Sequence, residues 1–529
     1  MRLSYKWQAA IVVAMGLFMA VLDNTIVSVA LPRMQSAFHT NSDTINWVVT
    51  GYFLAQAAVI PITGYLSDLL GTKSVFLAAL ALFTLGSGLC ALAPNETMLI
   101  GFRILQGIGG GALFPTAFAI VFRVFPPAER GAAGAVIGVP ILLAPAFGAT
   151  IGGYLTTTFD WSAIFTVNVP IGIVTIIAAS FILRGRAAEH AEHTELAHGR
   201  NRLDVLGLLL AMVGFTAIVY GINEASSRGW QDVTVDRFLI GGGVVLVLFM
   251  ITELIVKDPV IDIRLFANYT FTIANVLMWA ISSFLFGSLF LLPYFFENIR
   301  GFTPLHTGEI LIIQGITAAV ATVFAGRFYN RIGPRWMTAV GMLMVVIGTW
   351  GFTQFTMTTS GADVQMWLAF RGLGLGLTNI PLQTLALSVV SNKAMARASS
   401  LVSVTRQVFS AVGVSALFSY LSQQTLSHVP AVTTAFQGTP LKQAKLTCFA
   451  QIGPNVPVLR NCVQQIASKY IGPHAFVLGL NDTFMAVLIG CAICVPLALL
   501  VGRDPAVEAF RRAQANGEPS AASPVLVAE

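Results

Sequence analysis

Long apolar stretches separated by short polar ones recur along the whole of this 529-residue chain. A helix that crosses the hydrocarbon core of a bilayer needs about 20 mostly apolar residues, and fourteen stretches reach that length. Their approximate ranges are 7–31, 46–66, 74–93, 97–121, 131–156, 163–183, 204–224, 238–256, 270–296, 305–326, 336–357, 364–389, 398–424 and 476–501. The first is too long for the apolar part of a cleavable signal. The pattern predicts an all-α integral membrane protein.

The Lys and Arg residues orient these predicted spans. If the N-terminus faces the cytoplasm, 19 of them fall in cytoplasmic segments and 4 in short outer segments. Another 4 lie in one long outer segment, 425–475, which such charge counts discount. Because cytoplasmic loops are enriched in Lys and Arg, we expect both termini in the cytoplasm.

Composition supports a membrane protein and excludes several functions. Hydrophobic residues make up 56% of the chain and charged residues 10%, against roughly 25% charged in a soluble domain. The net charge is +6, but no basic stripe with interleaved aromatic residues indicates nucleic-acid binding. The sequence contains no metal-ligand cluster, phosphate-binding loop or nucleophile–base pair. We therefore expect neither an enzyme nor a cofactor.

Two cytoplasmic segments share one spacing, which indicates a duplication. Gly64-x3-Asp68-x2-Gly71-x-Lys73 follows the second predicted span, and Gly326-x3-Asn330-x2-Gly333-x-Arg335 follows the tenth. Duplicated helical bundles around a central path are a common plan of secondary transporters. The predicted organisation is a six-helix bundle (1–188), a cytoplasmic linker (189–203), two inserted spans (204–258), a second six-helix bundle (259–503) with its outer loop (425–475), and a cytoplasmic tail (504–529).

Several motifs make the chain resemble the major facilitator superfamily, and within it the fourteen-spanner drug:proton antiporters of the EmrB/QacA type. They are the repeated loop above, Leu22 to Pro32 (LDNTIVSVALP), Arg103 to Gly107 (RILQG), the segment from Trp161 to Gly172, and Asp258 to Asp262 (DPVID). The antiporter motif of the fifth span usually has a proline where this chain has Ala149, although Pro145 stands four residues earlier. The resemblance implies two six-helix bundles with two inserted spans.

Carboxylates at membrane depth are costly and mark candidate proton sites. Asp23 and Arg103 lie at similar predicted depths on the first and fourth spans, which line the central cavity in this superfamily, so we expect an ion pair that couples proton transfer or only fixes the helices. Glu309 is either a second proton site or attractor of cations, or a wet carboxylate at a helix start. Glu253 is expected to reach the cytoplasmic interface in a structural role.

The resemblance also implies a gate and a substrate site. In the gate, Asp68 is expected to bond a neighbouring helix end in the outward-facing state, while Gly64 and Gly71 allow close helix approach and Lys73 completes the motif. Candidate substrate contacts are polar or aromatic residues, although helical phenylalanines more often face lipid or packing: Asn24, Phe53, Gln56, Asn275, Trp279, Phe286, Phe290, Asn379 and Gln383.

The remaining buried cations and thiols have open interpretations. Arg371 and Arg406 must find carboxylates, carbonyls or water inside the bundle, and a structural network is expected for Arg406. Cys448 and Cys462 share the outer segment and form either a disulfide or two free thiols. Cys491 and Cys494 are expected to be apolar packing residues.

These features favour a proton-driven exporter of lipophilic, often cationic compounds in the bacterial inner membrane, with the proton gradient as energy source. A dedicated exporter of one metabolite, peptide or lipid is the alternative within transport. A non-transporting sensor is the alternative of another class, although the chain has no loop long enough for a soluble domain. The expected partners are lipophilic small molecules, membrane lipid and, if the route crosses an outer membrane, a periplasmic adaptor; the chain is expected to work as a monomer.

Overall fold

The computed structural model describes residues 4–184, 204–256, 259–452, 456–502, 504 and 507–508, and the predicted linker and nearly all of the predicted tail lie outside these ranges. The described chain is helical, as predicted. The first-half helices are α1 (Tyr5–Phe38), α2 (Ser42–Leu70), α3 (Thr72–Ala91), α4 (Glu96–Val124), α5 (Arg130–Thr158), α6 (Ala163–Thr166) and α7 (Asn168–Ile182). The inserted helices are α9 (Val205–Arg228) and α10 (Val233–Ile255). The second-half helices are α11 (Tyr269–Tyr294), α12 (Pro304–Ile332), α13 (Pro334–Phe352), α14 (Gly361–Ser388), α15 (Met395–Phe436), α16 (Thr439–Ile452) and α17 (Val456–Leu499).

Local sequence signals set many of the helix ends. Asn41 and Asn95 cap α2 and α4 by accepting a hydrogen bond from a backbone N–H of the first turn, and Ser360 with Asp363 forms a capping box at α14. The repeated loop motif ends α2 and α12 in the same way, because Gly71 and Gly333 both adopt a φ of 87°. That left-handed region strongly favours glycine. The duplication seen in the sequence is therefore a duplicated turn.

Twelve of the described helical segments are long and apolar enough to cross a membrane. They include ten of the named helices from α1 to α15, the combined segment Ala163–Ile182, and Cys462–Leu499 of α17. Two further helices, α11 and α14, lie within the second half as 26- and 28-residue elements. The helices observed thus cover all fourteen predicted stretches.

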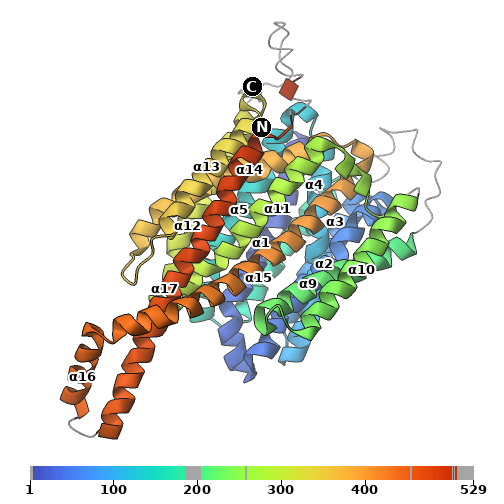
Figure 1. Cartoon of the computed structure of the whole chain (residues 1–529). Helices are drawn as coiled ribbons and strands as arrows, with labels where there is room; N and C mark the ends of the chain where they lie inside the picture. Colours follow the sequence, from blue (N-terminus) through green and yellow to red (C-terminus); the bar gives the residue numbers. More distant parts are fainter. Residues whose placement is uncertain are drawn as a thin grey trace.

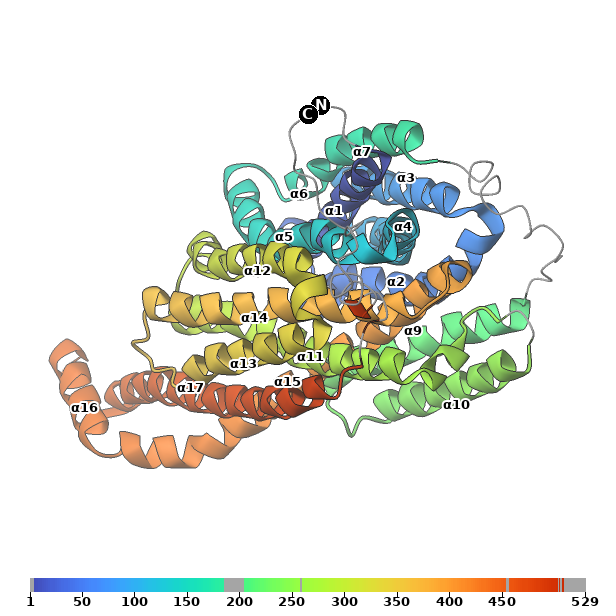
Figure 2. The ribbon, with the colours of Figure 1, turned by 90° about the horizontal axis from the view of Figure 1, so that it is seen from above.

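The two halves lie side by side, with the inserted pair at one edge (Figure 2). α9 packs against α10, α2 and α15, and its Asn223 donates a 2.9 Å hydrogen bond to Thr50 of α2. The turn between α9 and α10 contacts α15, because Trp230 donates a 2.8 Å hydrogen bond to Ser419. The α10 helix exposes a run of aliphatic side chains, which suits a helix facing lipid.

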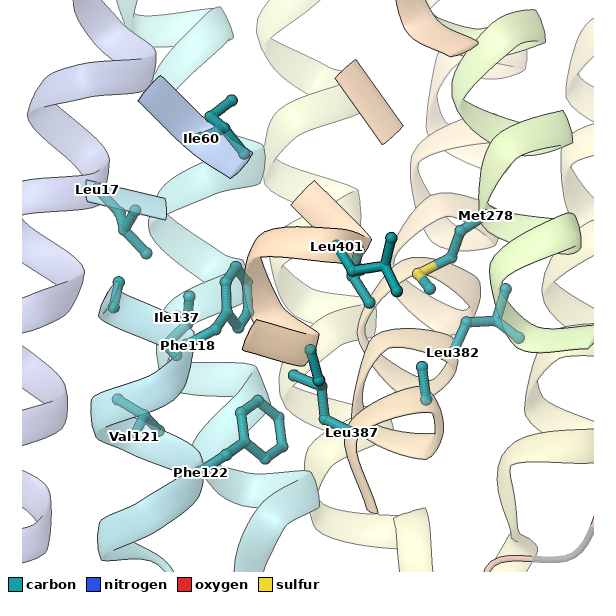
Figure 3. Close-up of a cluster of buried hydrophobic side chains, with 14 of the residues drawn as sticks. Leu17, Ile60, Phe118, Val121, Phe122, Ile137, Met278, Leu382, Leu387 and Leu401 are labelled. Atoms are coloured by element: carbon teal, nitrogen blue, oxygen red, sulfur yellow. The ribbon is translucent and has the colours of Figure 1, made fainter. Parts of the chain in front are cut away.

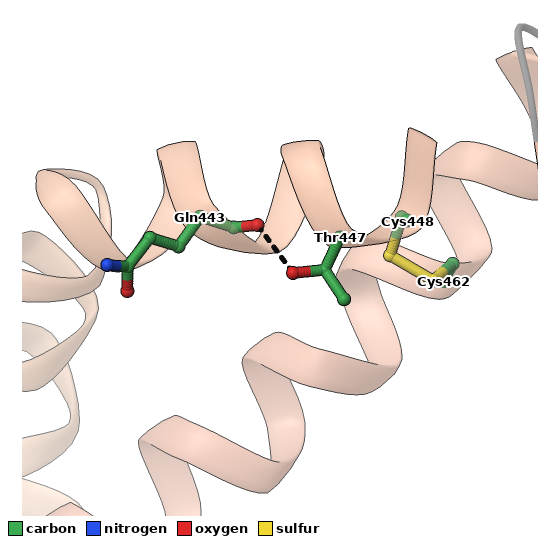
Figure 4. The surroundings of a disulfide bond; sticks show 4 residues. All are labelled: Gln443, Thr447, Cys448 and Cys462. Atoms are coloured by element: carbon green, nitrogen blue, oxygen red, sulfur yellow. Dashed lines mark hydrogen bonds between the residues drawn. A yellow bond between two sulfur atoms is a disulfide. The ribbon is translucent and has the colours of Figure 1, made fainter. Parts of the chain in front are cut away.

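The prediction that residues 425–475 form an outer loop is wrong. α15 continues to Phe436, α16 follows, and α17 begins at Val456, so the segment is a helical extension that projects from one end of the molecule (Figure 1). Cys448 and Cys462 form a disulfide within it (Figure 4). The sequence signal was misleading because the segment is polar, which argues against a membrane span but does not prevent helix formation.

We call the end of the bundle where α1 begins the terminal side, and the end that carries α16 the far side (Figure 1). A hydrophobic cluster joins the halves toward the terminal side. Figure 3 shows Phe118 and Phe122 of the first half near Leu387 and Leu401 of the second. Within a bilayer such contacts are stabilised mainly by van der Waals packing, because lipid tails are as apolar as these side chains.

Candidate functional site

Asp23 on α1 lies at the centre of a buried polar network. Its side chain is fully buried, and its Oδ2 is 2.6 Å from Nη1 of Arg103 on α4, which is 1% exposed. Asp23 is the nineteenth residue of α1 counted from Tyr5, which places it about 27 Å from the start of the helix at 1.5 Å per residue. The ion pair expected between the first and fourth spans is therefore present, deep in the bundle.

Two amides complete the hydrogen bonds of the Asp23 carboxylate. Gln106 Nε2 donates to Oδ1 at 2.9 Å, and Asn168 Nδ2 at the start of α7 donates to the same oxygen at 2.8 Å. Arg103 also donates to the Val48 carbonyl at 3.1 Å, and its guanidinium carbon lies 4.1 Å from the Tyr52 ring centroid. These donors stabilise a buried negative charge.

Gln106, Asn168 and Tyr52 are parts of this network that the sequence analysis did not assign to a site. A signal was present, because polar side chains within apolar spans are costly unless they have partners. Gln106 follows Arg103 by three residues, so both lie on one face of α4. Only the tertiary structure shows that they meet Asn168 of α7, which lies about 60 residues further along the chain.

Asp68 at the end of α2 joins three helices on the terminal side. Its Oδ1 is 3.3 Å from Nη2 of Arg123 on α4, and its Oδ2 is 2.9 Å from Nε of Arg397 on α15. Arg123 also donates to Thr72 at 2.6 Å. The expected bond to a neighbouring helix end is present, and it crosses between the two halves.

The other motif residues support this contact in different ways. A Cβ on Gly64 would lie 2.7 Å from the Arg397 Cα, so only glycine permits the approach of α2 to α15. Lys73 instead stays within the first half, where it donates to the Ser180 and Leu183 carbonyls at the end of α7. A cation there satisfies carbonyls that the helix end leaves unpaired.

Further contacts hold the halves together on the terminal side. Arg130 of α5 donates to the Asn392 Oδ1 at 3.2 Å and to the Leu387 carbonyl at 3.5 Å. In contrast, the helices against which α1 packs extensively all belong to the first half, and those of α11 all belong to the second. We interpret this arrangement as closed on the terminal side.

The two glutamates of uncertain role lie apart from the Asp23 network. Glu309 is 58% exposed by side chain and lies 3.2 Å from His306, as a carboxylate near a wet helix start would. Glu253 has the structural role expected of it, but its side chain does not reach the interface. It is fully buried and accepts the Val260 and Ile261 backbone N–H groups at 3.2 and 3.3 Å, so it fixes the turn between α10 and α11.

The candidate substrate residues divide into separate groups. Gln56 faces Gln407 of α15 at 3.5 Å, and Trp279 stacks on Phe409 of α15 with ring centroids 4.7 Å apart. Asn275 donates to the Phe271 carbonyl of its own helix. Asn24, Phe53 and Asn379 are half-buried and Gln383 is buried, while the side chains of Phe286 and Phe290 lie outside the described part. The Gln56 and Trp279 groups both meet α15.

Within the described ranges, Arg371 and Arg406 do not meet carboxylates. Arg371 of α14 is 1% exposed, donates to Ser288 of α11 and has its guanidinium carbon 5.4 Å from the Phe352 ring centroid. Arg406 of α15 is half-buried, with its guanidinium carbon 5.9 Å from the ring centroid of Phe114 on α4. Among the described residues, neither arginine has a carboxylate within 4.0 Å.

An apolar cavity of about 780 Å³ lies between α1, α5 and α12. Aliphatic and aromatic side chains line most of it, including Ile11, Phe18, Val139 and Leu143, and Arg327 and Glu129 add polar groups. The hydrophobic pattern along the chain did not reveal this cavity, because it forms only where helices of the two halves meet.

Comparisons with known proteins agree with this architecture. Residues 13–414 match the pattern of the Major Facilitator Superfamily. The chain is 35% identical over 425 residues to the Multidrug resistance protein B homolog of Mycobacterium tuberculosis (strain ATCC 25618 / H37Rv), covering 79% of this chain and 76% of that protein. It is 30% identical over 511 residues to the uncharacterized MFS-type transporter YhcA of Bacillus subtilis (strain 168), covering 95% and 94%. The solved structure of the proton:xylose symporter XylE has a TM-score of 0.58 at 14% identity, covering 96% of this chain and 99% of that one, and supports the fold.

Proposed function

The chain belongs to the major facilitator superfamily, and from that premise we propose that it exports lipophilic compounds in exchange for protons by alternating access. The terminal side is then cytoplasmic, and α16 projects from the outer face of a bacterial inner membrane. A monomer suffices, the proton gradient supplies the energy and no cofactor takes part. Because this is a family of transporters, the chain is not an enzyme, and a non-transporting sensor is not proposed.

The buried Asp23–Arg103 pair is the observation that carries this proposal. A proton arriving at Asp23 removes its charge, and Arg103 then loses its only carboxylate partner among the described residues. An unpaired buried cation is destabilised, so α1 and α4 are driven to a different arrangement. Release of that proton to the cytoplasmic side restores the pair, which makes protonation a switch between two states.

The Asp68 contact supplies the second element that alternating access requires. Its bonds to Arg123 and Arg397 hold the cytoplasmic ends of the halves together, and α1 and α11 pack within their own halves. In this proposal the observed state is therefore closed toward the cytoplasm. Opening toward the cytoplasm must break the Asp68–Arg397 bond.

A broad range of substrates is supported by the names of relatives and by the apolar cavity. Relatives at 31% to 35% identity carry the name multidrug resistance protein or multidrug transporter, and the cavity between α1, α5 and α12 offers lipophilic molecules an apolar surface. A dedicated exporter of one metabolite, peptide or lipid would instead bind a single compound far more tightly than its analogues. In a two-membrane cell, the helical extension at α16 is the surface that an adaptor would meet first.

Dye transport in proteoliposomes with an imposed proton gradient tests the coupling. We expect gradient-driven uphill transport by the unaltered protein and its loss in Asp23→Asn, which keeps the shape of the side chain but removes the charge. Glu309→Gln is the matched control, because it makes a similar change at an exposed carboxylate and is expected to leave transport intact. Full transport by Asp23→Asn, or transport that persists after collapse of the gradient, contradicts proton coupling through Asp23.

A further inference from the structure

Charge within the helix interiors is unbalanced. Arg103, Arg371 and Arg406 all lie well inside helices, and Asp23 pairs with Arg103. The described residues offer Arg371 and Arg406 no carboxylate within ion-pairing distance. A cation at membrane depth is expensive unless an anion, carbonyls or water compensate it, so each of the two remaining arginines needs an account.

Arg406 differs from Arg371 because it lies where the two halves meet. Arg406 follows the gate residue Arg397 by nine residues on α15, and Phe114 precedes the gate residue Arg123 by nine on α4. Both therefore stand about 13 Å from the gate along their helices. The guanidinium carbon of Arg406 is 5.9 Å from the Phe114 ring centroid of the other half, and the next residue, Gln407, faces Gln56 at 3.5 Å.

A pair of stacked aromatic rings lies one turn further along α15. Phe409 follows Arg406 by three residues, which places both on one face of the helix, and Trp279 of α11 stacks on Phe409 at an interplanar angle of 6°. Trp279 Nε1 is buried without a hydrogen-bond partner within the described structure. One half-buried cation, two amides and three rings form a region that is apolar apart from a single positive charge and a few polar groups.

Such a region favours one class of ligand. An acidic head group can pair with Arg406 and relieve its lack of a counter-ion, and a planar guanidinium binds carboxylate or sulfonate oxygens with two parallel hydrogen bonds. An apolar body can lie against the rings. A cationic compound meets repulsion from Arg406 and has no free carboxylate in this group of residues.

We propose that the transported substrates are amphiphilic organic anions whose acidic group pairs with Arg406 and whose apolar part lies against Phe114 and the Trp279–Phe409 pair. This inference rests on the proposed function, since it names the substrate class of the exporter. It reverses the expectation of cationic substrates that the family resemblance gave. Arg371 takes no part, because it is enclosed within the second half.

Equilibrium binding of two dyes with one scaffold tests the proposal. Fluorescein is an anionic xanthene at mildly alkaline pH, and rhodamine 6G is a cationic one. Fluorescence polarisation is measured with the full-length protein in lipid nanodiscs and no gradient. We expect the protein to bind fluorescein more tightly, and Arg406→Gln to weaken fluorescein binding about tenfold or more, the scale of losing one buried charge pair. Arg406→Lys retains the charge and is expected to keep most of the preference.

Arg237→Gln is the matched control, since it removes the same charge from an exposed side chain of α10, and its dye preference is expected to be unchanged. Tighter binding of rhodamine 6G, no binding of fluorescein, or an equal preference in Arg406→Gln and unaltered protein overturns the proposal. The Asp23→Asn protein distinguishes failure of the proposed substrate class from failure of proton coupling. If it binds fluorescein through Arg406 and the unaltered protein transports without a gradient, proton coupling fails while the substrate class stands.

Discussion

The two halves of the molecule place an arginine on their fourth helix against a residue of their first helix, with different outcomes. In the first half, Arg103 of α4 meets the carboxylate of Asp23 on α1. In the second, Arg371 of α14 meets the hydroxyl of Ser288 on α11. Both arginines are 1% exposed. The scaffold was duplicated, but among the described residues only the first half pairs its buried arginine with a carboxylate.

This difference teaches that helix duplication fixes position and not chemistry. A carboxylate beside an arginine is a pair whose charge state can change, whereas a hydroxyl beside an arginine stays neutral. The sixth span of the first half contributes Asn168 to the Asp23 network, whereas Cys491 of α17 in the second half is a buried free thiol. The second half is therefore expected to respond to the proton gradient only through the first.

The largest effect is expected from Arg103→Gln. The change leaves Asp23 as a buried carboxylate without a cation, which typically costs about 3–5 kcal/mol. We expect a strong loss of thermal stability in detergent and loss of gradient-driven transport. The double variant Asp23→Asn/Arg103→Gln should recover stability but not transport. Equal stability of Arg103→Gln and the unaltered protein would contradict the importance of the pair.

A carboxylate placed in the second half tests the comparison directly. Ser288→Asp puts an acid beside Arg371 and is expected to be tolerated, because it forms the ion pair that this half lacks. Ser282→Asp is its control on the same helix. Ser282 is also buried, but among the described residues no arginine donates a hydrogen bond to it. We expect Ser282→Asp to destabilise by several kcal/mol, since a buried charge there has no partner. Thermal unfolding measures both, and equal destabilisation would show that Arg371 does not accept an acid.

The gate residues of the repeated motif also differ between the halves. Asp68→Asn removes the charge that joins Arg123 and Arg397, so we expect transport to fall about tenfold, the effect of roughly 1.4 kcal/mol. Asn330→Asp, the matching position of the second half, is expected to change transport less. Labelling of a single cysteine introduced near the gate should show greater access from the cytoplasmic side in Asp68→Asn. Unchanged access and transport would remove Asp68 from the gate.

The smallest effect on transport is expected from removing the disulfide, which lies in an extension that the first half lacks. Cys448 and Cys462 are separated by 14 residues, and closing a loop of that size stabilises by about 3 kcal/mol in the chain-entropy account. Cys448→Ser/Cys462→Ser should make α16 more sensitive to proteases while transport is retained. A large loss of transport would instead connect the extension to the transport cycle.

Individual residues show how far prediction from sequence reached. Asp23 and Arg103 were expected as partners from their similar depths and from the family resemblance, which places the first and fourth spans at the central cavity. The contact of Asp68 with a neighbouring helix followed from the family motif. The segment 425–475 was misread because its polarity resembles that of a loop. Glu253 was expected at the interface, whereas backbone N–H groups from the next turn enclose it. Backbone partners of that kind leave no mark in a side-chain pattern.

The sequence by itself determined the membrane-spanning helices, their order and the duplicated turn, because hydrophobic length and glycine conformation are local properties of the chain. Only the tertiary structure decided which polar side chains meet. It brought Gln106 and Asn168 to Asp23, gave Arg371 a hydroxyl instead of an acid, and left Arg406 facing the other half without a carboxylate. The reason is physical: the cost of a buried charge depends on partners from distant helices, and those are known only once the helices have packed.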